Sequence, residues 1–445
     1  MFHNTIDVPD SPAADLQGQR VFLMLQGPHG PFFDRLASQL RESGAEVWRC
    51  AFNAGDEFFW SDRARLLRHT GTGADWPAHL ARIIAGRGIT DIILYGDVRP
   101  VHAAARLAAR RHGLRLHVFE EGYLRPFWIS YERGGSNGHS ALLGISLSEM
   151  AAALRDTPSE VRRPPAHWGD MRQHKVYGAF YHFLLLMANL RYRQFASHRA
   201  VPVWREFWLN LCRLVLMPFH AVVRAVQWRR FRLSGRPYIL VPLQLEHDSS
   251  LQGHSPYTRN RQFVDEVMAA FARGAPGHHH LLFKSHPLDD GRGRNRRTIR
   301  AAARRHGLAG RVHYLRGGKL AVMLDHARAI ITVNSTAAQQ ALWRGLPVKA
   351  LGRAVYAKPG LVSGQSLGEF CRDPQQPDLA ACRVFRRYLL QTSQVPGGFY
   401  ARRSRAHAMR LVVDLILAAE DPYQALACGR VQRRHQIGED LDRAA

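Results

Sequence analysis

Four carboxylates in this sequence are placed where they could carry out group transfer. Glu120 and Glu121 stand side by side after an apolar run that ends at Phe119. Repulsion between adjacent carboxylates and partial burial would raise the pKa of one of them, as a general acid or base requires. Glu246 and Asp248 follow a second apolar run, and a carboxylate there could attack an anomeric carbon. Taken singly, each carboxylate could instead cap a helix or pair with one of the many arginines.

A second set of polar residues follows other apolar runs and could bind a phosphate. They are Gln244 after one run, Lys284, His286 and Pro287 after the next, and Asn334, Ser335 and Thr336 after a third. The last group also opens a predicted helix, where hydroxyls and free backbone N–H groups can hold an anion. An ammonium and an imidazole could donate to the same anion. The alternative interpretation is a plain helix cap and an ordinary loop histidine.

These residues lie at the ends of predicted strands in a regular α/β pattern. The first unit has predicted strands at residues 21–25, 45–50, 91–95 and 114–119. The second unit has predicted strands at residues 238–243, 280–284, 312–315 and 329–333. Alternating strands and helices are typical of Rossmann-like sheets, in which ligands bind beyond the carboxyl ends of the strands. The sequence therefore predicts an α/β, GT-B-like fold with two Rossmann-like domains.

The segment between the two units is basic and aromatic. From Asp170 to Arg236 there are 12 Lys and Arg residues against two acidic ones. This composition favours long helices that either pack between the domains or lie on an anionic membrane surface. The expected organisation is a flexible segment at residues 1–19, a domain at 20–164, a helical insertion at 165–236, a domain at 237–400, a helix at 401–421 and a flexible tail at 422–445. The helix at 401–421 is expected to cross back to the first domain.

The overall composition favours anionic partners. Lys and Arg number 62 against 36 Asp and Glu, a formal net charge of +26, although an Arg-rich genome would have the same effect. No helix-turn-helix, zinc-finger or RNP-like pattern is present, so nucleic acid is not expected as a partner. Five widely spaced cysteines without a C-x-x-C pair indicate a reducing compartment and no zinc cluster. The first residues lack a secretory signal pattern, and no apolar run is long enough for a membrane span, so we expect a cytoplasmic protein.

Several longer segments resemble the capsule polysaccharide biosynthesis/export family. They are LQGPHGPFF at residues 25–33, FEEGYLRP at 119–126, WI at 128–129, ERGGSNGHS at 132–140, VPLQ at 241–244, DS at 248–249, HP at 286–287 and NST at 334–336. The EEGYLRP segment is far more specific than any three-residue motif. The family includes β-Kdo transferases with one module, the KpsS or LipB type, or with two. This chain has one copy of each segment and so resembles the single-module type.

The resemblance implies a role for each matching position. Asp248 would be the nucleophile, with Glu246 as the alternative, because some relatives carry an acidic pair in the glutamine-containing motif. Glu121 would be the acid/base, with Glu120 as the alternative. The nucleotide-sugar would be bound by Gln244, Lys284, His286, Pro287, Asn334, Ser335 and Thr336. The acceptor side would be formed by Gly27, His29, Gly30, Arg125 and Asn137. The resemblance implies no metal and no other cofactor for this transfer.

The resemblance also implies a reaction and a location. A retaining enzyme of this type would move β-Kdo from CMP-β-Kdo to a (lyso)phosphatidylglycerol lipid and start the poly-Kdo linker of a capsular polysaccharide. Its partners would be the nucleotide-sugar, the anionic phospholipid, the membrane surface and other capsule assembly or export proteins. Its place would be the inner face of the bacterial inner membrane, as a peripheral protein. Two alternatives stay open: a related transferase with another CMP-sugar, and a non-catalytic export partner that would tolerate the loss of Glu121 and Asp248.

Overall fold

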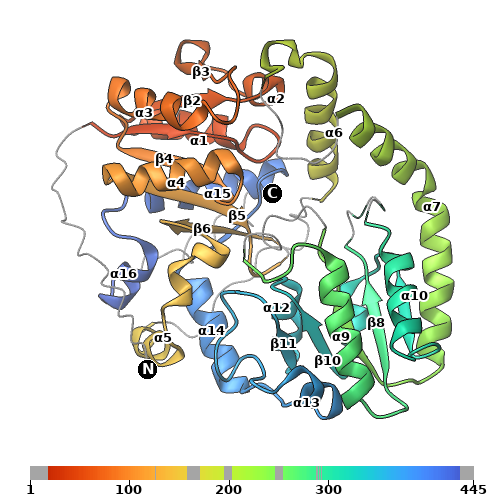
Figure 1. Ribbon diagram of the computed structural model, residues 1–445. Coiled ribbons are helices and arrows are strands. Elements are labelled where there is room, and N and C mark those ends of the chain that lie inside the picture. Colours follow the sequence, from red (N-terminus) through yellow and green to blue (C-terminus); the bar gives the residue numbers. More distant parts are fainter. Residues whose placement is uncertain are drawn as a thin grey trace.

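Two α/β domains, each built on a largely parallel sheet, form the body of the protein (Figure 1). The computed structural model describes residues 19–125, 127–157, 171–194, 203–245, 254–286, 289, 291 and 293–430. The predicted GT-B-like fold class, with two Rossmann-like domains, is confirmed.

The N-terminal domain contains a seven-stranded sheet in the order β12-β6-β5-β4-β1-β2-β3. Its strands are β1 (Val21–Met24), β2 (Glu46–Ala51), β3 (Leu66–Arg68), β4 (Asp91–Tyr95), β5 (Arg115–Glu121), β6 (Trp128–Arg133) and β12 (Gln394–Pro396). Strands β1 to β5 are parallel, whereas β6 pairs antiparallel with β5, and β12 antiparallel with β6. The carboxyl ends of β1, β4 and β5 therefore meet at one edge of the sheet.

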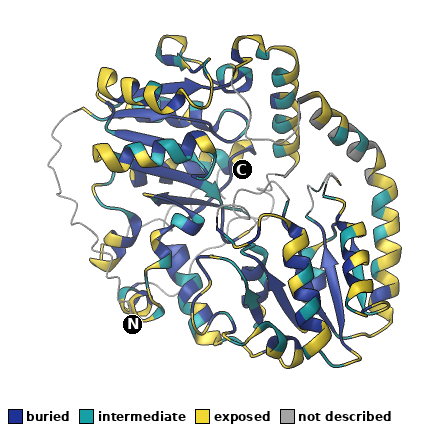
Figure 2. Cartoon of the chain, in the orientation of Figure 1, coloured by how far each residue is buried: buried dark blue, intermediate teal, exposed yellow. Residues whose placement is uncertain are grey.

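Helices cover both faces of this sheet. They are α1 (Phe32–Glu42), α2 (Ala54–Phe58), α3 (Trp76–Arg87), α4 (Pro100–His112) and α15 (Arg402–Leu417). Phe22 and Phe119 pack in a cluster with residues of α1 and α15, whereas their strand neighbours Leu23 and Val118 pack with residues of α3 and α4. This alternation follows from the two-residue period of a strand. It leaves the central strands buried on both faces, as Figure 2 shows.

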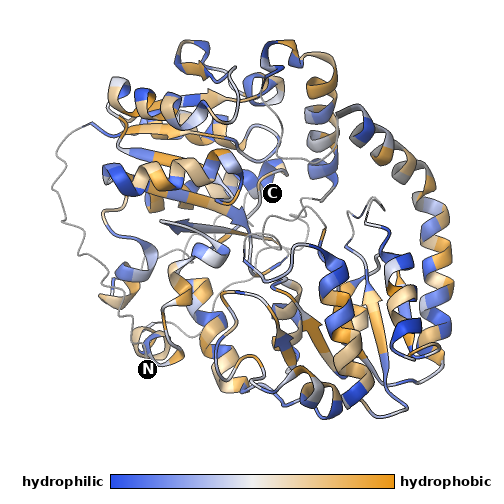
Figure 3. Cartoon of the chain, in the orientation of Figure 1, coloured by the Kyte–Doolittle hydropathy of each residue, from blue (hydrophilic) through white to orange (hydrophobic). Residues whose placement is uncertain are grey.

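The C-terminal domain contains a five-stranded parallel sheet in the order β11-β10-β7-β8-β9. Its strands are β7 (Tyr238–Pro242), β8 (His280–Lys284), β9 (Val312–Leu315), β10 (Ala329–Thr332) and β11 (Val348–Ala350). Its helices are α9 (Asn260–Gly274), α10 (Asn295–Arg305), α11 (Leu320–Leu324), α12 (Ala337–Leu342), α13 (Leu367–Arg372) and α14 (Leu379–Gln391). Apolar residues of the strands and of the inner faces of these helices form the core, and the strands are coloured mostly as hydrophobic in Figure 3. From earlier in the chain, α5 (Leu147–Ala153) packs against α14 and adds Met150 to this core.

After the second domain the chain returns to the first. Strand β12, which was not predicted, extends the N-terminal sheet, and α15, the predicted crossing helix, packs against α1. The expectation of a flexible tail from residue 422 is wrong at its start, because Pro422–Ala427 form α16. Asp421 caps this helix, and Tyr423 is buried with its hydroxyl donating to Glu132 at 2.8 Å. Residues 1–18 and 431–445 lie outside the described residues.

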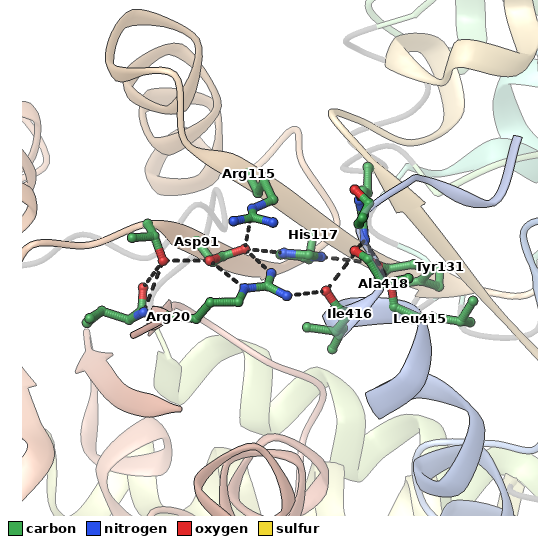
Figure 4. Close-up of polar contacts among 12 residues, drawn as sticks. Arg20, Asp91, Arg115, His117, Tyr131, Leu415, Ile416 and Ala418 are labelled. Atoms are coloured by element: carbon green, nitrogen blue, oxygen red, sulfur yellow. Dashed lines mark hydrogen bonds and ion pairs between the residues drawn. The ribbon is translucent and has the colours of Figure 1, made fainter. Parts of the chain in front are cut away.

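A buried ion-pair network joins α15 to the amino ends of the central strands (Figure 4). At the start of β4, Asp91 Oδ2 accepts from Arg20 Nε at 3.2 Å, and His117 Nε2 lies 2.8 Å from Asp91 Oδ1. Arg20 also donates to the carbonyl of Ile416 in α15 at 2.9 Å. Burial alone would raise the pKa of Asp91, but hydrogen bonds from His117 and Arg20 hold it below its usual value. The network lies at the opposite end of the strands from the predicted site, so its role is structural.

Two long helices, α6 (Met171–Met187) and α7 (Val203–Leu233), run along one side of the two domains (Figure 1). They confirm the long helices predicted for this basic segment. Asn53 Nδ2 donates to the Tyr181 hydroxyl at 2.7 Å and so anchors α6 on the N-terminal domain. The ring of Phe231 packs on Tyr238 at 5.1 Å and anchors α7 on the C-terminal domain. Among the described helices, none has the length and apolar character needed to cross a membrane.

Candidate active site

The predicted phosphate-binding residues gather at the carboxyl edge of the C-terminal sheet. Gln244 follows β7, Lys284 ends β8 and Asn334 follows β10, and β7 lies between the other two strands. Gln244 Nε2 donates to Asn334 Oδ1 at 2.8 Å, so these two side chains are in direct contact. Asn260 Nδ2 donates to the Gln244 carbonyl at 2.8 Å and holds the end of β7 in place. His286, half-buried, lies two residues beyond β8 at the same edge.

The turn after β10 is held by hydrogen bonds to both sides of Ser335. The Ser335 hydroxyl accepts from the Ala337 N–H at 3.2 Å, and the Tyr356 hydroxyl donates to the Ser335 carbonyl at 2.8 Å. The Thr336 side chain makes no capping hydrogen bond to α12 and lines a crevice between the domains. Ser335 therefore makes a local hydrogen bond at the start of α12, and phosphate binding by Asn334, Ser335 and Thr336 stays a prediction.

Lys284 is a buried cation at this edge. Its side chain is 5% exposed, and its Nζ donates to the Ser285 carbonyl at 3.4 Å. Burial, with a smaller contribution from the Arg224 guanidinium, lowers the pKa of Lys284 to about 8. A bound anion would add the opposite charge that this ammonium group needs, which suits a phosphate.

The crevice between the domains is narrow, with a volume of about 10 Å³. Tyr123 and Asn137 line it from one side, and Asn334, Gln339 and Arg353 line it from the other. Gln339 is fully buried, yet neither polar atom of its amide has a hydrogen-bond partner among the residues that the structure describes. Because buried polar groups are nearly always paired, this amide indicates a partner in the crevice, either a water molecule or a polar group of a ligand. Sequence reasoning missed Gln339 and Arg353, since a helical glutamine and a loop arginine carry no distinctive pattern.

The paired carboxylates of β5 point to opposite faces of the sheet. Glu120 lies on the face of Val118, where the Asn137 amide donates to its Oε2 at 3.5 Å. Burial, followed by repulsion from Asp97 and Glu121, raises the pKa of Glu120 to about 8. Glu121 lies on the other face, and its Oε1 accepts from the Tyr95 hydroxyl at 3.1 Å. The predicted raised pKa therefore belongs to Glu120, the residue that contacts the crevice through Asn137.

The predicted acceptor-side residues divide into two groups. The His29 ring stacks on Tyr181 of α6 at 4.3 Å. Gly30 has a φ of +110°, and a Cβ added there would lie 3.1 Å from the Tyr177 ring, so this loop needs glycine to meet α6. A Cβ on Gly27 would lie 2.7 Å from Phe33. Asn137 instead lines the interdomain crevice, and Arg125 is exposed, with its Nε donating to the Gly122 carbonyl at 3.2 Å.

Three predicted site residues fall outside the described residues: Glu246, Asp248 and Pro287. The choice of nucleophile between Glu246 and Asp248 therefore stays a prediction. The segment that carries them joins Gln244, at the end of β7, to His254 in the described part of the C-terminal domain.

Residues 90–400 match the family described as capsule polysaccharide biosynthesis protein. The chain belongs to this family. It is 31% identical over 391 residues to the capsule polysaccharide export protein KpsS of Escherichia coli, which covers 86% of this chain and 98% of that protein. It is 32% identical over 393 residues to the capsule polysaccharide modification protein LipB of Neisseria meningitidis serogroup A. This alignment covers 87% of this chain and 93% of LipB. A solved structure, the KpsC beta Kdo 2,7 transferase of Thermosulfurimonas dismutans, is 13% identical, covers 88% of this chain and 100% of that one, and has a TM-score of 0.43.

The long segment that carried the resemblance to this family builds one buried hydrogen-bond network. The carboxylate of Glu132 accepts from the hydroxyls of Tyr123 at 2.5 Å and Tyr423 at 2.8 Å, and also from Ser140. The Tyr123 hydroxyl in turn accepts from the Asn137 N–H at 2.8 Å. Asn137 has a φ of +51°, a conformation that asparagine tolerates better than most residues. The network therefore holds Asn137 in position between Glu120 and the crevice.

Proposed function

We propose that this protein is a retaining glycosyltransferase of capsule assembly, moving β-Kdo from CMP-β-Kdo to a (lyso)phosphatidylglycerol acceptor. Membership of the capsule polysaccharide biosynthesis family supports the pathway, and the likeness to KpsS and LipB supports the single-module type. The observation that carries the proposal for this chain is the meeting of polar side chains from both domains at the interdomain crevice. There the Gln339 amide, which has no partner among the described residues, lies between the predicted phosphate-binding turn and the loop that reaches Glu120.

The proposed reaction has two steps. The carboxylate of Asp248, or of Glu246, attacks the anomeric carbon of Kdo, and the bond to the phosphate breaks so that CMP leaves with the electron pair. The acceptor hydroxyl then attacks the same carbon, loses its proton to a carboxylate of β5 and releases the nucleophile, which restores the original anomeric configuration. The pKa near 8 and the contact with Asn137 favour Glu120 as this base over the predicted Glu121. Neither step requires a metal or another cofactor.

Donor binding is assigned to the C-terminal domain. Lys284, His286 and Thr336 would hold the phosphate of CMP and the carboxylate of Kdo, because their strands end at one edge of the sheet. Gln339 and Arg353 would add an amide and a guanidinium from the same side of the crevice. The acceptor would enter from the side of His29 and α6.

The outer faces of α6 and α7 are proposed to lie on the anionic membrane that holds the acceptor lipid. Large apolar side chains stand in solvent there, among them Trp204 at 65% exposed, Trp208 at 60% and Phe219 at 65%. Exposed arginines such as Arg229 and Arg232 lie among them, and Glu206 is the one acidic residue in the two helices. Basic amphipathic helices of this kind bind anionic lipid surfaces. The proposal places the protein peripherally on the inner face of the inner membrane.

The test is incubation of the protein with CMP-Kdo and a fluorescent phosphatidylglycerol analogue, followed by the product mass. The expected gain is one Kdo, lost in Asp248→Ala and in Glu120→Gln and kept in Glu42→Gln, which changes an exposed carboxylate on α1. Loss in Glu121→Gln with activity in Glu120→Gln would restore the original assignment of the base. CMP protection against heat without product would indicate another sugar or acceptor, and no protection would favour a non-catalytic export partner.

The proposed contact with the membrane is tested separately, by flotation of the protein with lipid vesicles. Flotation with vesicles containing phosphatidylglycerol should carry the protein upward, and vesicles of phosphatidylcholine alone should not. Trp208→Glu and Phe219→Glu should reduce flotation, whereas Leu107→Glu, at a 50% exposed leucine on α4, should leave it unchanged. Equal flotation of all three variants would contradict the assignment of this face.

A further inference from the structure

Three potential metal ligands from distant parts of the chain meet at the domain boundary. Asp97 follows β4, His139 ends a short 3-10 turn at Asn137–His139, and His254 belongs to the C-terminal domain. One ligand atom of each residue lies within 4.8 Å of the corresponding atoms of the other two. His139 Nδ1 is 2.9 Å from Asp97 Oδ2, and the rings of His139 and His254 are 4.7 Å apart at 85°.

The carboxylate of Asp97 is incompletely paired. The residue is 1% exposed, and its Oδ2 accepts from the Ser136 N–H at 3.1 Å as well as contacting His139. Its Oδ1 is buried without a hydrogen-bond partner in the described part of the chain. An unsatisfied buried acceptor is costly, and the cost is higher for a charged group. A cation bound at Oδ1 would remove this cost.

The third ligand is held in place independently of the other two. The His254 carbonyl accepts from the Arg353 N–H at 2.9 Å and from Asn334 Nδ2 at 3.5 Å, which fixes the residue on the C-terminal domain. A Cβ added at Gly138 would lie 2.2 Å from His254 Nδ1. Glycine at this position therefore lets the imidazole reach the turn that carries His139.

We propose that Asp97, His139 and His254 bind one divalent transition-metal ion that joins the two domains. Two imidazoles and one carboxylate suit Zn²⁺ and its first-row neighbours better than Mg²⁺ or Ca²⁺, which prefer oxygen ligands. Two ligands come from the N-terminal domain and one from the C-terminal domain, so the ion is a structural link. The cluster borders the proposed active site, because Asp97 contributes to the raised pKa of Glu120, and a cation bound there would lower that pKa. The zinc test does not use the transfer reaction. The sequence analysis, which expected no metal, had no spacing pattern by which to find this site.

The test uses the full chain without an affinity tag, stripped with EDTA and then given one equivalent of Zn²⁺. We expect about one zinc per chain after desalting, measured by elemental mass spectrometry, and a higher melting temperature than that of the stripped protein. Asp97→Asn and His254→Gln should each lower zinc affinity by about tenfold or more. Gly138→Ala should do the same while keeping all three ligands, because its Cβ displaces His254.

A matched control separates this site from adventitious binding by other histidines. His278→Gln changes an exposed histidine of the C-terminal domain and should leave zinc content and the melting temperature unchanged. Zinc content that is equal in all variants, or absent from the wild type, would overturn the proposal. If a variant fails to fold, the visible spectrum of the Co²⁺-loaded protein, compared between wild type and His139→Gln, gives the same decision, because an unchanged spectrum excludes His139 as a ligand.

Discussion

The buried carboxyl group of Glu132 should make the stability of this protein depend on pH in a way that one substitution removes. Burial raises the pKa of Glu132 from 4.5 to about 7, even though three hydroxyls donate to it. Below pH 4.5 the group is neutral in both the folded and the unfolded chain. Between these two values only the unfolded chain ionises, so the free energy of unfolding falls as pH rises. Each pKa unit corresponds to about 1.4 kcal/mol, and the total loss is about 3 kcal/mol.

Glu132→Gln cannot ionise and should lack this loss. Urea unfolding of both proteins, at steps between about pH 5 and pH 8, should show the variant gaining about 3 kcal/mol relative to wild type across the range. The quantity to follow is the difference in the free energy of unfolding between the variant and the wild type at each pH. Contributions of the other titrating groups, including Glu120, are the same in both proteins and cancel in this difference. Glu42→Gln, at an exposed carboxylate, should follow the wild type at every pH. Parallel curves for Glu132→Gln and wild type would show that Glu132 is ionised throughout, and the reasoning from burial would fail.

Three further outcomes follow from the site and the core. Gln339→Leu should abolish heat protection by CMP at little cost to the unliganded fold, because the amide has no partner among described residues; full protection would remove Gln339 from the site. CMP affinity should fall as pH rises through about 8, where Lys284 loses its proton, and Lys284→Met should flatten the profile measured by calorimetry. Asp91→Asn should destabilise the protein by about 3–5 kcal/mol in urea unfolding, because Arg20 and His117 lose their buried partner; a change below about 1 kcal/mol would contradict a structural role for the network.

The strand ends that carry the site were predictable from sequence because each follows an uninterrupted apolar run. Strands β4 and β8 begin and end where they were predicted, and Gln244 and Asn334 meet as expected of neighbouring parallel strands. Strand β12 was not predictable, since three residues that pair only with β6 have no periodicity of their own. Helix α16 was missed because its burial depends on Glu132, which is far away in the sequence.

Among the site residues, too, features that depend on contacts between distant segments could not be predicted from the sequence. Adjacent carboxylates on a strand predicted one raised pKa, but the choice of Glu120 depends on which face receives Asp97 and Asn137. The Gln339 amide, without a partner in the part of the chain that the structure describes, and the meeting of His139 with His254 both result from tertiary packing alone. Sequence patterns report local periodicity, whereas these features arise from segments brought together by the fold.

The position of β12 sets an order of events during synthesis. The sheet of the N-terminal domain gains its last strand, and its covering helix α15, only after the whole C-terminal sheet has been made. Until then the outer edge of β6 is an unpaired strand edge on the nascent chain, and such edges invite pairing with other chains. A ribosome-bound chain that stops before residue 394 should therefore need a chaperone, and expression of residues 20–164 alone should yield aggregates. The N-terminal domain is therefore completed only when β12 and α15 join it, after the C-terminal sheet has been synthesised.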